Sequence, residues 1–376
     1  MTADRFELRT PHVVFGPGSR VQLPAEVDRV GGRRVLLVAD AYHPEVVDDL
    51  VSGLGTRLAG RTGQIAQHVP VELATATVDE ADRIGADLVV SFGGGSATGL
   101  AKLVARERGL PIVAVPTTYA GSEMTPIWGQ SEGQRKTTGR DPRVLPRTAI
   151  YDPELTLGMP ADLTAVSGMN AIAHAVESLY APDVSPLVVM LAEEAIRSLA
   201  SALPGCVDAP NDLSARSDAL LGAWLAGLTL GNSTMGLHHR LCHVLGGLGL
   251  PHGEVHAAVL PYAAAYNAPA APAAMRRVAV ALGVTGAPGE VDGSAAPAAL
   301  WQLGRRLGTP INLVAAGFDP ALTDEVTAAL LANPPANPRP IEADGVRELL
   351  AAASAGQIPA PELSATEVGS NHGRAR

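Results

Sequence analysis

The chain has 376 residues, carries a formal net charge of −10, and is 47% hydrophobic but only 3% aromatic. Its 28 basic residues are outnumbered by 38 acidic ones and form no basic stripe, which argues against nucleic-acid binding. No apolar run reaches the roughly 20 residues of a membrane span, and the first residues lack the pattern of a secretory signal. Cys206 and Cys242 are too few for a disulfide framework. We therefore expect a cytoplasmic protein without a membrane partner.

Two residue types are distributed unevenly along the chain. Of the 28 basic residues only Lys102 and Lys136 are lysines, and the rest are arginines. Because a compact ammonium and a planar guanidinium are not interchangeable, both lysines are candidates for a special role. Five of the ten histidines fall between His238 and His256.

The first part of the chain predicts alternating strands and helices. Apolar runs at Arg34–Val38, Ala86–Phe92 and Pro111–Val115 predict buried strands, and Val46–Arg57 and Ala97–Arg106 predict helices. Strands of about five residues separated by helices are typical of a parallel sheet covered on both faces. We therefore predict a Rossmann-like α/β domain over residues 1–160.

The pattern changes after Asp152. Helical periodicity continues to about residue 356, with no convincing strand, in segments that include Met169–Leu179, Leu187–Leu203, Ser214–Leu230 and Arg240–Leu248. We predict an all-α second domain over residues 161–356, a ligand-binding cleft between the two domains, and a polar tail over residues 357–376 that is disordered.

A glycine loop joins a predicted strand to a predicted helix at Gly93, Gly94, Gly95 and Ser96. Glycines let the backbone approach a pyrophosphate, and the helix N-terminus supplies N–H groups and partial positive charge. The spacing is not that of the G-x-G-x-x-G fingerprint, so a tight turn without a ligand is the alternative.

Other residues are predicted to bind the same nucleotide. Asp40 ends an early strand, where a carboxylate would bind ribose hydroxyls and favour NAD(H) over NADP(H), and a helix N-cap is its alternative. Lys102 follows Ser96 by about one and a half helical turns, with a solvated surface cation as the alternative. The next strand is followed by small and hydroxyl residues, and the candidates there and just beyond are Thr117, Thr118, Tyr119, Ser122 and Lys136.

Histidines form the second candidate site. Asn170 and His174 lie four residues apart on a predicted helix and therefore face the same way, and His239 and His243 repeat this spacing on another helix. His252 follows nine residues later. Converging imidazoles suit proton transfer or a divalent metal, whereas any one histidine alone is more simply explained as a hydrogen-bonded structural residue.

The residue at position 170 decides between these chemistries. A carboxylate there would complete an Asp/His₃ site for Fe²⁺ or Zn²⁺, but the carbonyl of Asn170 is neutral and a much poorer ligand. We expect no tightly bound catalytic metal, with weak binding of Zn or Fe still open to His174, His239 and His252. For His238 and His256 we expect structural or supporting roles.

Together these features resemble the iron-containing alcohol dehydrogenase superfamily, whose architecture is also called dehydroquinate synthase-like. The shared features are the strand–GGGS–helix loop, the Pro-Thr-Thr loop and DPELT at 152–156, followed by a helical domain with spaced histidines. Within the superfamily the chain is similar to the maleylacetate reductases, through SGMNAIAHAVE (167–177), GLHHRLCHVLGG (236–247) and NPPANPRP (333–340). Gly99 and Asn170 stand where metal-dependent members usually have Asp.

The resemblance implies a homodimer that reduces the C=C bond of maleylacetate, a dicarboxylate, to 3-oxoadipate in aromatic-compound degradation. The expected cofactor is NADH, with NADPH as an alternative. The competing hypotheses are a metal-dependent alcohol dehydrogenase, a reductase of a related enoyl or keto acid, and a catalytically inert cofactor-binding homologue.

For this reaction we predict that His243 donates the proton or stabilises the enolate. The remaining residues of the predicted catalytic set are Asn170, His174, His239 and His252. Arg140 or Arg339 is predicted to hold a substrate carboxylate, because a guanidinium matches that group bidentately.

Overall fold

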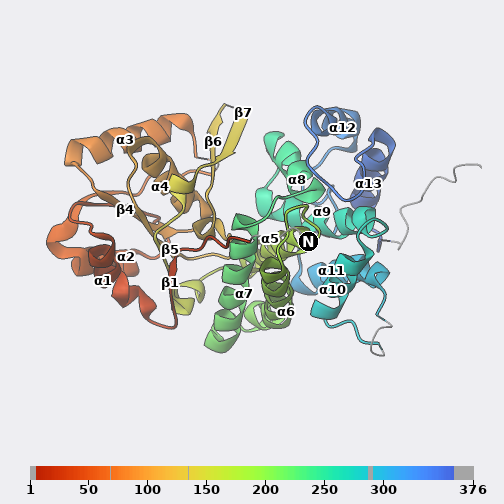
Figure 1. Cartoon of the computed structure of the whole chain (residues 1–376), viewed down its shortest axis with the longest axis horizontal. Helices are drawn as coiled ribbons and strands as arrows, with labels where there is room; N and C mark the ends of the chain where they lie inside the picture. The colour runs from red at the N-terminus through yellow and green to blue at the C-terminus, as the bar shows by residue number, and fades with distance from the viewer. Residues whose placement is uncertain (1–5, 68, 134, 287–290, 360–376) are drawn as a thin grey trace, which may run out of the picture.

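The computed structural model describes residues 6–67, 69–133, 135–286 and 291–359. Figure 1 shows an α/β part and a helical part arranged along the long axis of the molecule. Residues 360–376 of the predicted tail lie outside the described residues. No helix in the described ranges is both long enough and apolar enough to cross a membrane.

The α/β part is built on a six-stranded parallel sheet with the order β1-β8-β5-β4-β2-β3. Every residue of β2, β4, β5 and β8 is buried, which explains their continuous apolar runs. The predicted parallel α/β layer is confirmed. The strands are β1 (His12–Phe15), β2 (Val35–Ala39), β3 (Leu58–Thr62), β4 (Leu88–Gly93), β5 (Ile112–Pro116) and β8 (Thr148–Tyr151).

Helices cover both faces of this sheet. Leu37 of β2 packs in one core cluster with α1 (Leu23–Val30) and α2 (Pro44–Leu54). Leu36, its neighbour, packs in another with α3 (Val71–Ile84) and α4 (Gly95–Arg108), because successive strand residues point to opposite faces. The connections after β2 and β4 thus lead to opposite faces of the sheet.

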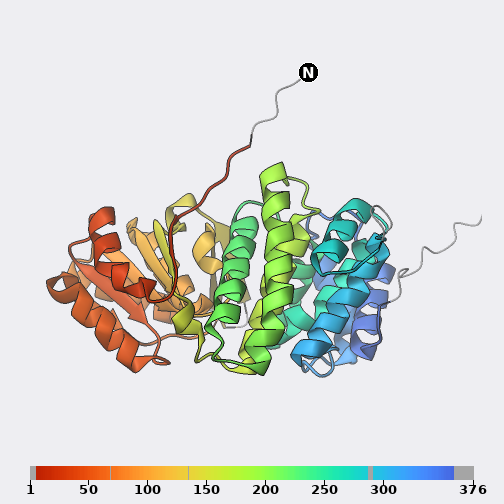
Figure 2. The same ribbon diagram turned by 90° about the horizontal axis from the view of Figure 1, so that it is seen from below.

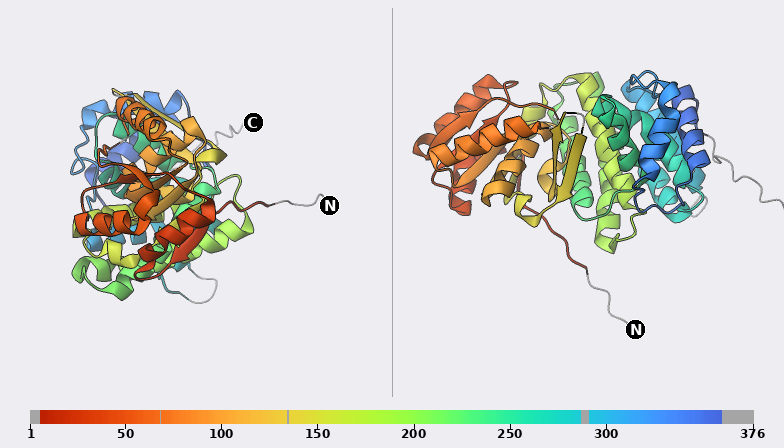
Figure 3. Two further views of the ribbon diagram at one scale, coloured as in Figure 1. Left: turned by 90° about the vertical axis from the view of Figure 1, so that its left-hand side faces the viewer. Right: turned by 90° about the horizontal axis from the view of Figure 1, so that it is seen from above.

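A separate antiparallel hairpin, β6 (Ile127–Glu132) with β7 (Arg135–Arg140), stands beside the helical part (Figure 3). The guanidinium of Arg106 lies 4.0 Å from the ring centroid of Trp128 and holds the hairpin to α4.

The helical part surrounds α5, which is buried almost throughout and contacts α6, α7, α9 and α11. Figure 2 shows these long helices side by side. The predicted all-α architecture is confirmed, with no strand among the described residues beyond Tyr151. The helices are α5 (Ala161–Ser178), α6 (Pro186–Asp208), α7 (Leu213–Gly231), α8 (Leu237–Gly247), α9 (His252–Asn267), α10 (Pro272–Ala281), α11 (Ala296–Leu307), α12 (Thr323–Leu331) and α13 (Ala343–Ala355).

Short 3₁₀ helices complete the described structure: η1 (Ser19–Gln22), η2 (Gly55–Arg57), η3 (Ser122–Met124), η4 (Pro142–Val144), η5 (Pro153–Thr156), η6 (Gly293–Ala295) and η7 (Pro320–Leu322).

Glycines let the two parts touch backbone to backbone. A Cβ atom at Gly121 would lie 2.9 Å from the Cα of Gly227 on α7, and one at Gly231 would lie 2.4 Å from the carbonyl oxygen of Met124. Gly121 also has a φ of +72°, which side chains rarely adopt. The segment that follows β5 is therefore fixed closely against the helical part.

Candidate active site

The glycine loop lies at a topological switch point of the sheet. β2 and β4 are neighbours, and their following helices cover opposite faces. In open α/β sheets this is the place where a ligand crevice is expected, between the carboxyl ends of the two strands. A Cβ at Gly93 would lie 2.3 Å from Oδ2 of Asp40, and one at Gly94 would lie 3.1 Å from Cγ2 of Thr118. The structure thus brings Asp40, the glycines and the Pro-Thr-Thr loop together, with the N-terminus of α4 behind them.

The carboxylate of Asp40 faces the glycine loop and does not cap α2. The N-terminal cap of that helix is His43, without a side-chain bond, while Oδ1 of Asp40 accepts the N–H of Tyr42 at 3.2 Å. Burial raises the pKa of Asp40, against the hydrogen bond from Tyr42. The N-cap alternative for this residue is wrong.

Lys102 is wholly buried, and its ammonium contacts residues that follow β5. Its Nζ donates to the carbonyl oxygen of Ser122 (2.6 Å), Oγ1 of Thr125 (2.9 Å) and the carbonyl oxygen of Ile127 (2.7 Å). Burial lowers its pKa to about 7, against the nearby charge of Glu123. All three protons of the ammonium are engaged, so both the predicted cofactor contact and the surface-cation alternative are wrong.

Tyr119 also differs from its prediction. It is wholly buried in the helical core, its backbone N–H donates to Oγ of Ser167 (3.1 Å), and its hydroxyl accepts from Arg216 (3.3 Å). Burial raises the pKa of Tyr119 to about 12. Its ring is enclosed by protein and is not available to a cofactor. The side chain of Lys136, on β7, lies outside the described part of the structure.

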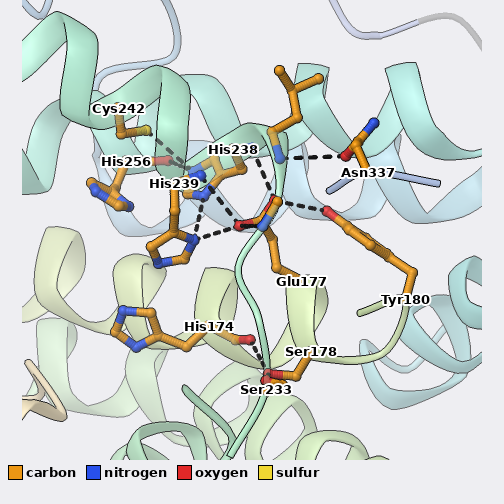
Figure 4. A network of polar contacts seen from close by, with 12 residues as sticks. His174, Glu177, Ser178, Tyr180, Ser233, His238, His239, Cys242, His256 and Asn337 are labelled. Carbon is orange, nitrogen blue, oxygen red and sulfur yellow. Dashed lines mark hydrogen bonds and ion pairs between the residues drawn. The ribbon is translucent and has the colours of Figure 1, made fainter. Parts of the chain in front are cut away.

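Three helices bring the predicted histidines together. The rings of His174 on α5 and His239 on α8 stack at 4.9 Å between centroids, and those of His239 and His256 on α9 lie 5.0 Å apart. His252 lies 4.2 Å from His256 and 6.4 Å from His243 by the same measure. Figure 4 shows His174, His239 and His256 grouped together.

One loop connects the two candidate sites. A Cβ at Gly121 would lie 3.7 Å from Nδ1 of His174, in the same loop whose Thr118 contacts Gly94. The nucleotide crevice and the histidine cluster are therefore adjacent. A cofactor bound along the glycine loop would reach toward the histidines.

Most of the buried histidines are held in their neutral form. Burial lowers the pKa of His174 and His256 well below the usual range and that of His238 to about 4, and neighbouring imidazoles lower each of them further. His238 is structural in part, since its Nε2 lies 3.1 Å from the carbonyl oxygen of His256.

Several buried polar atoms of this cluster have no hydrogen-bond partner among the described residues. A buried polar atom left without a partner costs on the order of 1–3 kcal/mol. Their grouping on facing helices marks the place where the polar groups of a ligand would be bound. These atoms are Oδ1 of Asn170, Nδ1 of His174, Nε2 of His239 and both ring nitrogens of His256.

Glu177, one turn beyond His174, belongs to the site although its position in the sequence did not single it out. It is wholly buried, and Oε2 accepts the Nδ1–H of His239 at 2.6 Å. Burial alone would raise its pKa, but the bond from His239, the adjacent imidazoles and backbone N–H donors lower it to about 2. Glu177 follows His174 by three residues, which places both on the same side of a helix. This spacing could have indicated Glu177, but the surrounding residues are apolar and drew no attention to it.

The donor set does not fit a tightly held iron. Asn170, His174, His239 and His252 offer imidazole nitrogens and one amide oxygen, which are ligand types without charge. The buried carboxylate of Glu177 is occupied behind His239. Among the described residues, His238, His239 and His256 each offer a ligand atom within 4.8 Å of the other two.

The two predicted substrate arginines make other contacts. The guanidinium of Arg140 donates to the carbonyl oxygens of Leu230 and Ser233, both at 3.0 Å, at the C-terminal end of α7. The guanidinium therefore bonds backbone oxygens, and this contradicts the prediction that Arg140 holds a substrate carboxylate. Arg339 lies 4.3 Å from the ring centroid of Tyr266 and donates to the carbonyl oxygen of that residue.

A glycine loop at a switch point, adjacent to histidines on a helical domain, defines a two-domain NAD(P)H-dependent oxidoreductase. Residues 10–153 match the family model described as iron-containing alcohol dehydrogenase, and residues 164–354 match that of the C-terminal part of the same family. The chain belongs to the iron-containing alcohol dehydrogenase family.

The similar proteins include several named maleylacetate reductases. The one from Burkholderia cepacia is 49% identical over 96% of this chain and 100% of its own, and maleylacetate reductase 2 from Cupriavidus pinatubonensis is 48% identical over 93% and 96%. The crystal structure of maleylacetate reductase from Rhizobium sp. strain MTP-10005 superposes with a TM-score of 0.88 at 42% identity, covering 96% of this chain and 100% of that one. The resemblance inferred from the motifs is confirmed.

Proposed function

We propose that the protein reduces the carbon–carbon double bond of maleylacetate to 3-oxoadipate, with NADH as hydride donor and NADPH as an alternative. The proposal rests on the sequence identity of 49% and 48%, over almost the whole chain, to two relatives that are named maleylacetate reductases. The histidine cluster agrees with it, since reduction of an activated double bond needs hydrogen-bond donors and a proton more than a Lewis acid.

The cofactor would lie along the switch-point crevice. Its pyrophosphate would meet the backbone from Gly93 to Ser96 and the N-terminus of α4, with Thr117 and Thr118 beside it. Asp40 would accept the ribose hydroxyls, and its charge would repel a 2′-phosphate.

The chemical step has two parts. The hydride adds to the carbon β to the keto group, the electron pair of the double bond moves to the keto oxygen, and the cofactor leaves oxidised. The resulting enolate then takes up one proton at carbon. We assign this proton, or stabilisation of the enolate, to His243, with His174, His239 and His252 shaping the site around the substrate.

In this proposal no tightly bound metal takes part. Imidazole N–H donors stabilise the oxyanion, and His174, His239 and His252 retain weak affinity for Zn or Fe. The iron implied by the family would act as a Lewis acid on a carbonyl or alkoxide oxygen. The neutral donor set of this site would hold such an iron poorly.

We also propose a cytoplasmic homodimer. Residues 6–10 precede the edge strand β1 and are mostly exposed (Figure 2), although the backbone of Arg9 is bonded to the side chain of Asn232. A second copy would have access to this segment. Light scattering would measure the mass, and removal of residues 1–11 should shift the protein toward a monomer.

The reaction is tested with purified, chelator-treated protein, maleylacetate and NADH, by following NADH absorbance. We expect stoichiometric NADH loss, strongly reduced by His243→Gln and unchanged by His12→Gln, an exposed histidine of the α/β part. No NADH loss, together with Fe²⁺- or Zn²⁺-dependent reduction of simple aldehydes, would contradict the proposal in favour of a metal-dependent alcohol dehydrogenase. Cofactor binding without turnover would indicate the inert homologue.

A further inference from the structure

Glu177 has the most fully engaged carboxylate of the histidine region (Figure 4). Oε2 accepts from Nδ1 of His239 at 2.6 Å and from the backbone N–H groups of Gly236 and His239 at 3.1 and 3.2 Å. Oε1 accepts from the backbone N–H of His238 at 2.9 Å and from the hydroxyl of Tyr180 at 3.3 Å. Five donors around a wholly buried side chain compensate for its lost hydration.

Three of these donors are backbone N–H groups at the start of α8. The N-terminal cap of that helix, Gly236, has no side chain to satisfy the first N–H groups, and Glu177 supplies the acceptors from α5 instead. A Cβ at Gly236 would lie 3.1 Å from Oε1, so the glycine gives the carboxylate room. Glu177 therefore fixes the helix that carries His239 against the helix that carries His174.

The same carboxylate determines how the ring of His239 is used. An ionised carboxylate only accepts, so Nδ1 of His239 must carry its proton toward Glu177. Nε2 then lies on the opposite side of the ring, where it is buried without a partner among the described residues, and the ring stacks on His174. Orientation of an imidazole by a carboxylate behind it is a recurring device in catalytic sites.

We propose that Glu177 is a positioning residue of the reaction: it holds His239 with Nδ1–H directed away from the substrate and Nε2 directed toward it. The effect on turnover rests on the proposed function, whereas the orientation of the ring does not. The competing explanation is that Glu177 only caps α8.

The decisive variant is Glu177→Gln, which keeps the size of the side chain but replaces one acceptor oxygen by a donating NH₂. An amide group turned to His239 would donate to Nδ1 and move the ring proton to Nε2. We expect kcat to fall by roughly 10- to 100-fold, with KM for NADH close to that of the wild type. Glu177→Asp keeps an acceptor-only carboxylate and should recover part of kcat.

The ring proton is observed directly by ¹⁵N NMR of histidine-labelled protein, with the His239 signals assigned by their loss in His239→Gln. In the wild type Nδ1 of His239 should carry the proton, and in Glu177→Gln the protonation pattern of the two nitrogens should change. This measurement needs no substrate, so it decides the positioning role even if maleylacetate proves not to be reduced. Failure of the wild type to turn over would contradict the proposed function alone.

Glu123→Gln is the matched control. Glu123 is also buried, and it accepts from the hydroxyl of Tyr151 at 2.6 Å, in the segment after β5 and without a histidine partner. This control should lower the unfolding midpoint while leaving the His239 signals and kcat near those of the wild type. If Glu177→Gln behaves in the same way, the carboxylate is only a helix cap and the proposal is wrong. Should Glu177→Gln fail to fold, Glu177→Asp is compared by the same two measurements, and wild-type kcat with an altered His239 signal would overturn the proposal.

Discussion

The ammonium of Lys102 lies 2.6 Å from the backbone oxygen of Ser122 and ties α4 to the segment between β5 and the β6–β7 hairpin. Its two other acceptors are Thr125 of the same segment and Ile127, the first residue of β6. The loop directly after β5 precedes this segment. It contacts the glycine loop through Thr118 and the histidine cluster through Gly121. A buried lysine thus supports the loop where the two candidate sites meet.

Replacement of Lys102 by Met should therefore act mainly on stability. Two backbone oxygens and one hydroxyl would lose a partner in a buried environment, and the free energy of unfolding should fall by on the order of 3 kcal/mol. Urea unfolding measures this, and titration of the folded variant with NADH should give a dissociation constant near that of the wild type. Arg108→Met, which removes an exposed ion pair on the same helix, should change the unfolding midpoint much less. A wild-type midpoint combined with weakened NADH binding would restore the cofactor-contact interpretation.

Asp40 should govern the choice between NADH and NADPH. Asp40→Ser removes the charge that faces the glycine loop, so the ratio of kcat/KM for NADPH to that for NADH should rise at least about tenfold, because like charges brought together cost on the order of 1 kcal/mol or more. Initial rates with each cofactor measure the ratio. Asp48→Ser, on the exposed face of α2, should leave it unchanged. If the ratio in Asp40→Ser is unchanged, the ribose of the cofactor does not bind at Asp40.

The sequence predicted the central strands because burial on both faces makes them continuous apolar runs, as in β2, β4 and β5. The edge strand β1 and the inner strand β8 have four residues each, too few for a pattern to be distinguished. The β6–β7 hairpin escaped prediction because Ile127–Glu132 is half-buried and mostly polar.

Site residues were predicted where their arrangement depends on local sequence, and were missed or misassigned where it depends on contacts between distant segments. The pairs Asn170–His174 and His239–His243 follow from helix geometry, which is local. Lys102, Tyr119 and Arg140 were misassigned because spacing gives the face on which a side chain lies but not the segment that covers it. The partner of Glu177 is 62 residues away on another helix, so the bond to His239 could be seen only in the fold.

Acid should destabilise the protein below about pH 6.5. The pKa of His238 falls from 6.5 in the unfolded chain to about 4 in the fold, because burial disfavours its charged form. Between these values the unfolded chain binds more protons, so stability is full above pH 6.5 and declines as pH falls toward 4, by on the order of 3 kcal/mol for this residue. His174 and His256, whose pKa values are also lowered by burial, act in the same direction.

Urea midpoints measured from pH 4 to pH 8 check this expectation. His238→Asn should show a shallower dependence on pH than the wild type, whatever its absolute stability. His12→Asn, which changes a half-exposed histidine, should keep the wild-type slope. A wild-type midpoint that is constant between pH 4 and pH 6.5 would mean that the fold does not lower the pKa values of these buried imidazoles.

Replacement of Asn170 by Asp should convert the neutral donor set into a metal site. Oδ1 of Asn170 is buried without a partner among the described residues, so a carboxylate there would destabilise the metal-free fold and bind a divalent cation together with His174 and His239. Calorimetry with Zn²⁺ should show affinity higher by on the order of 100-fold than in the wild type, and Zn²⁺ should raise the unfolding midpoint of the variant. Asn170→Ala is the control and should gain no affinity. The rate of maleylacetate reduction should not increase with the metal. Equal Zn²⁺ affinity in wild type and Asn170→Asp, or a faster reaction in the metal-loaded variant, would contradict the proposal that Asn170 prevents tight binding of a catalytic metal.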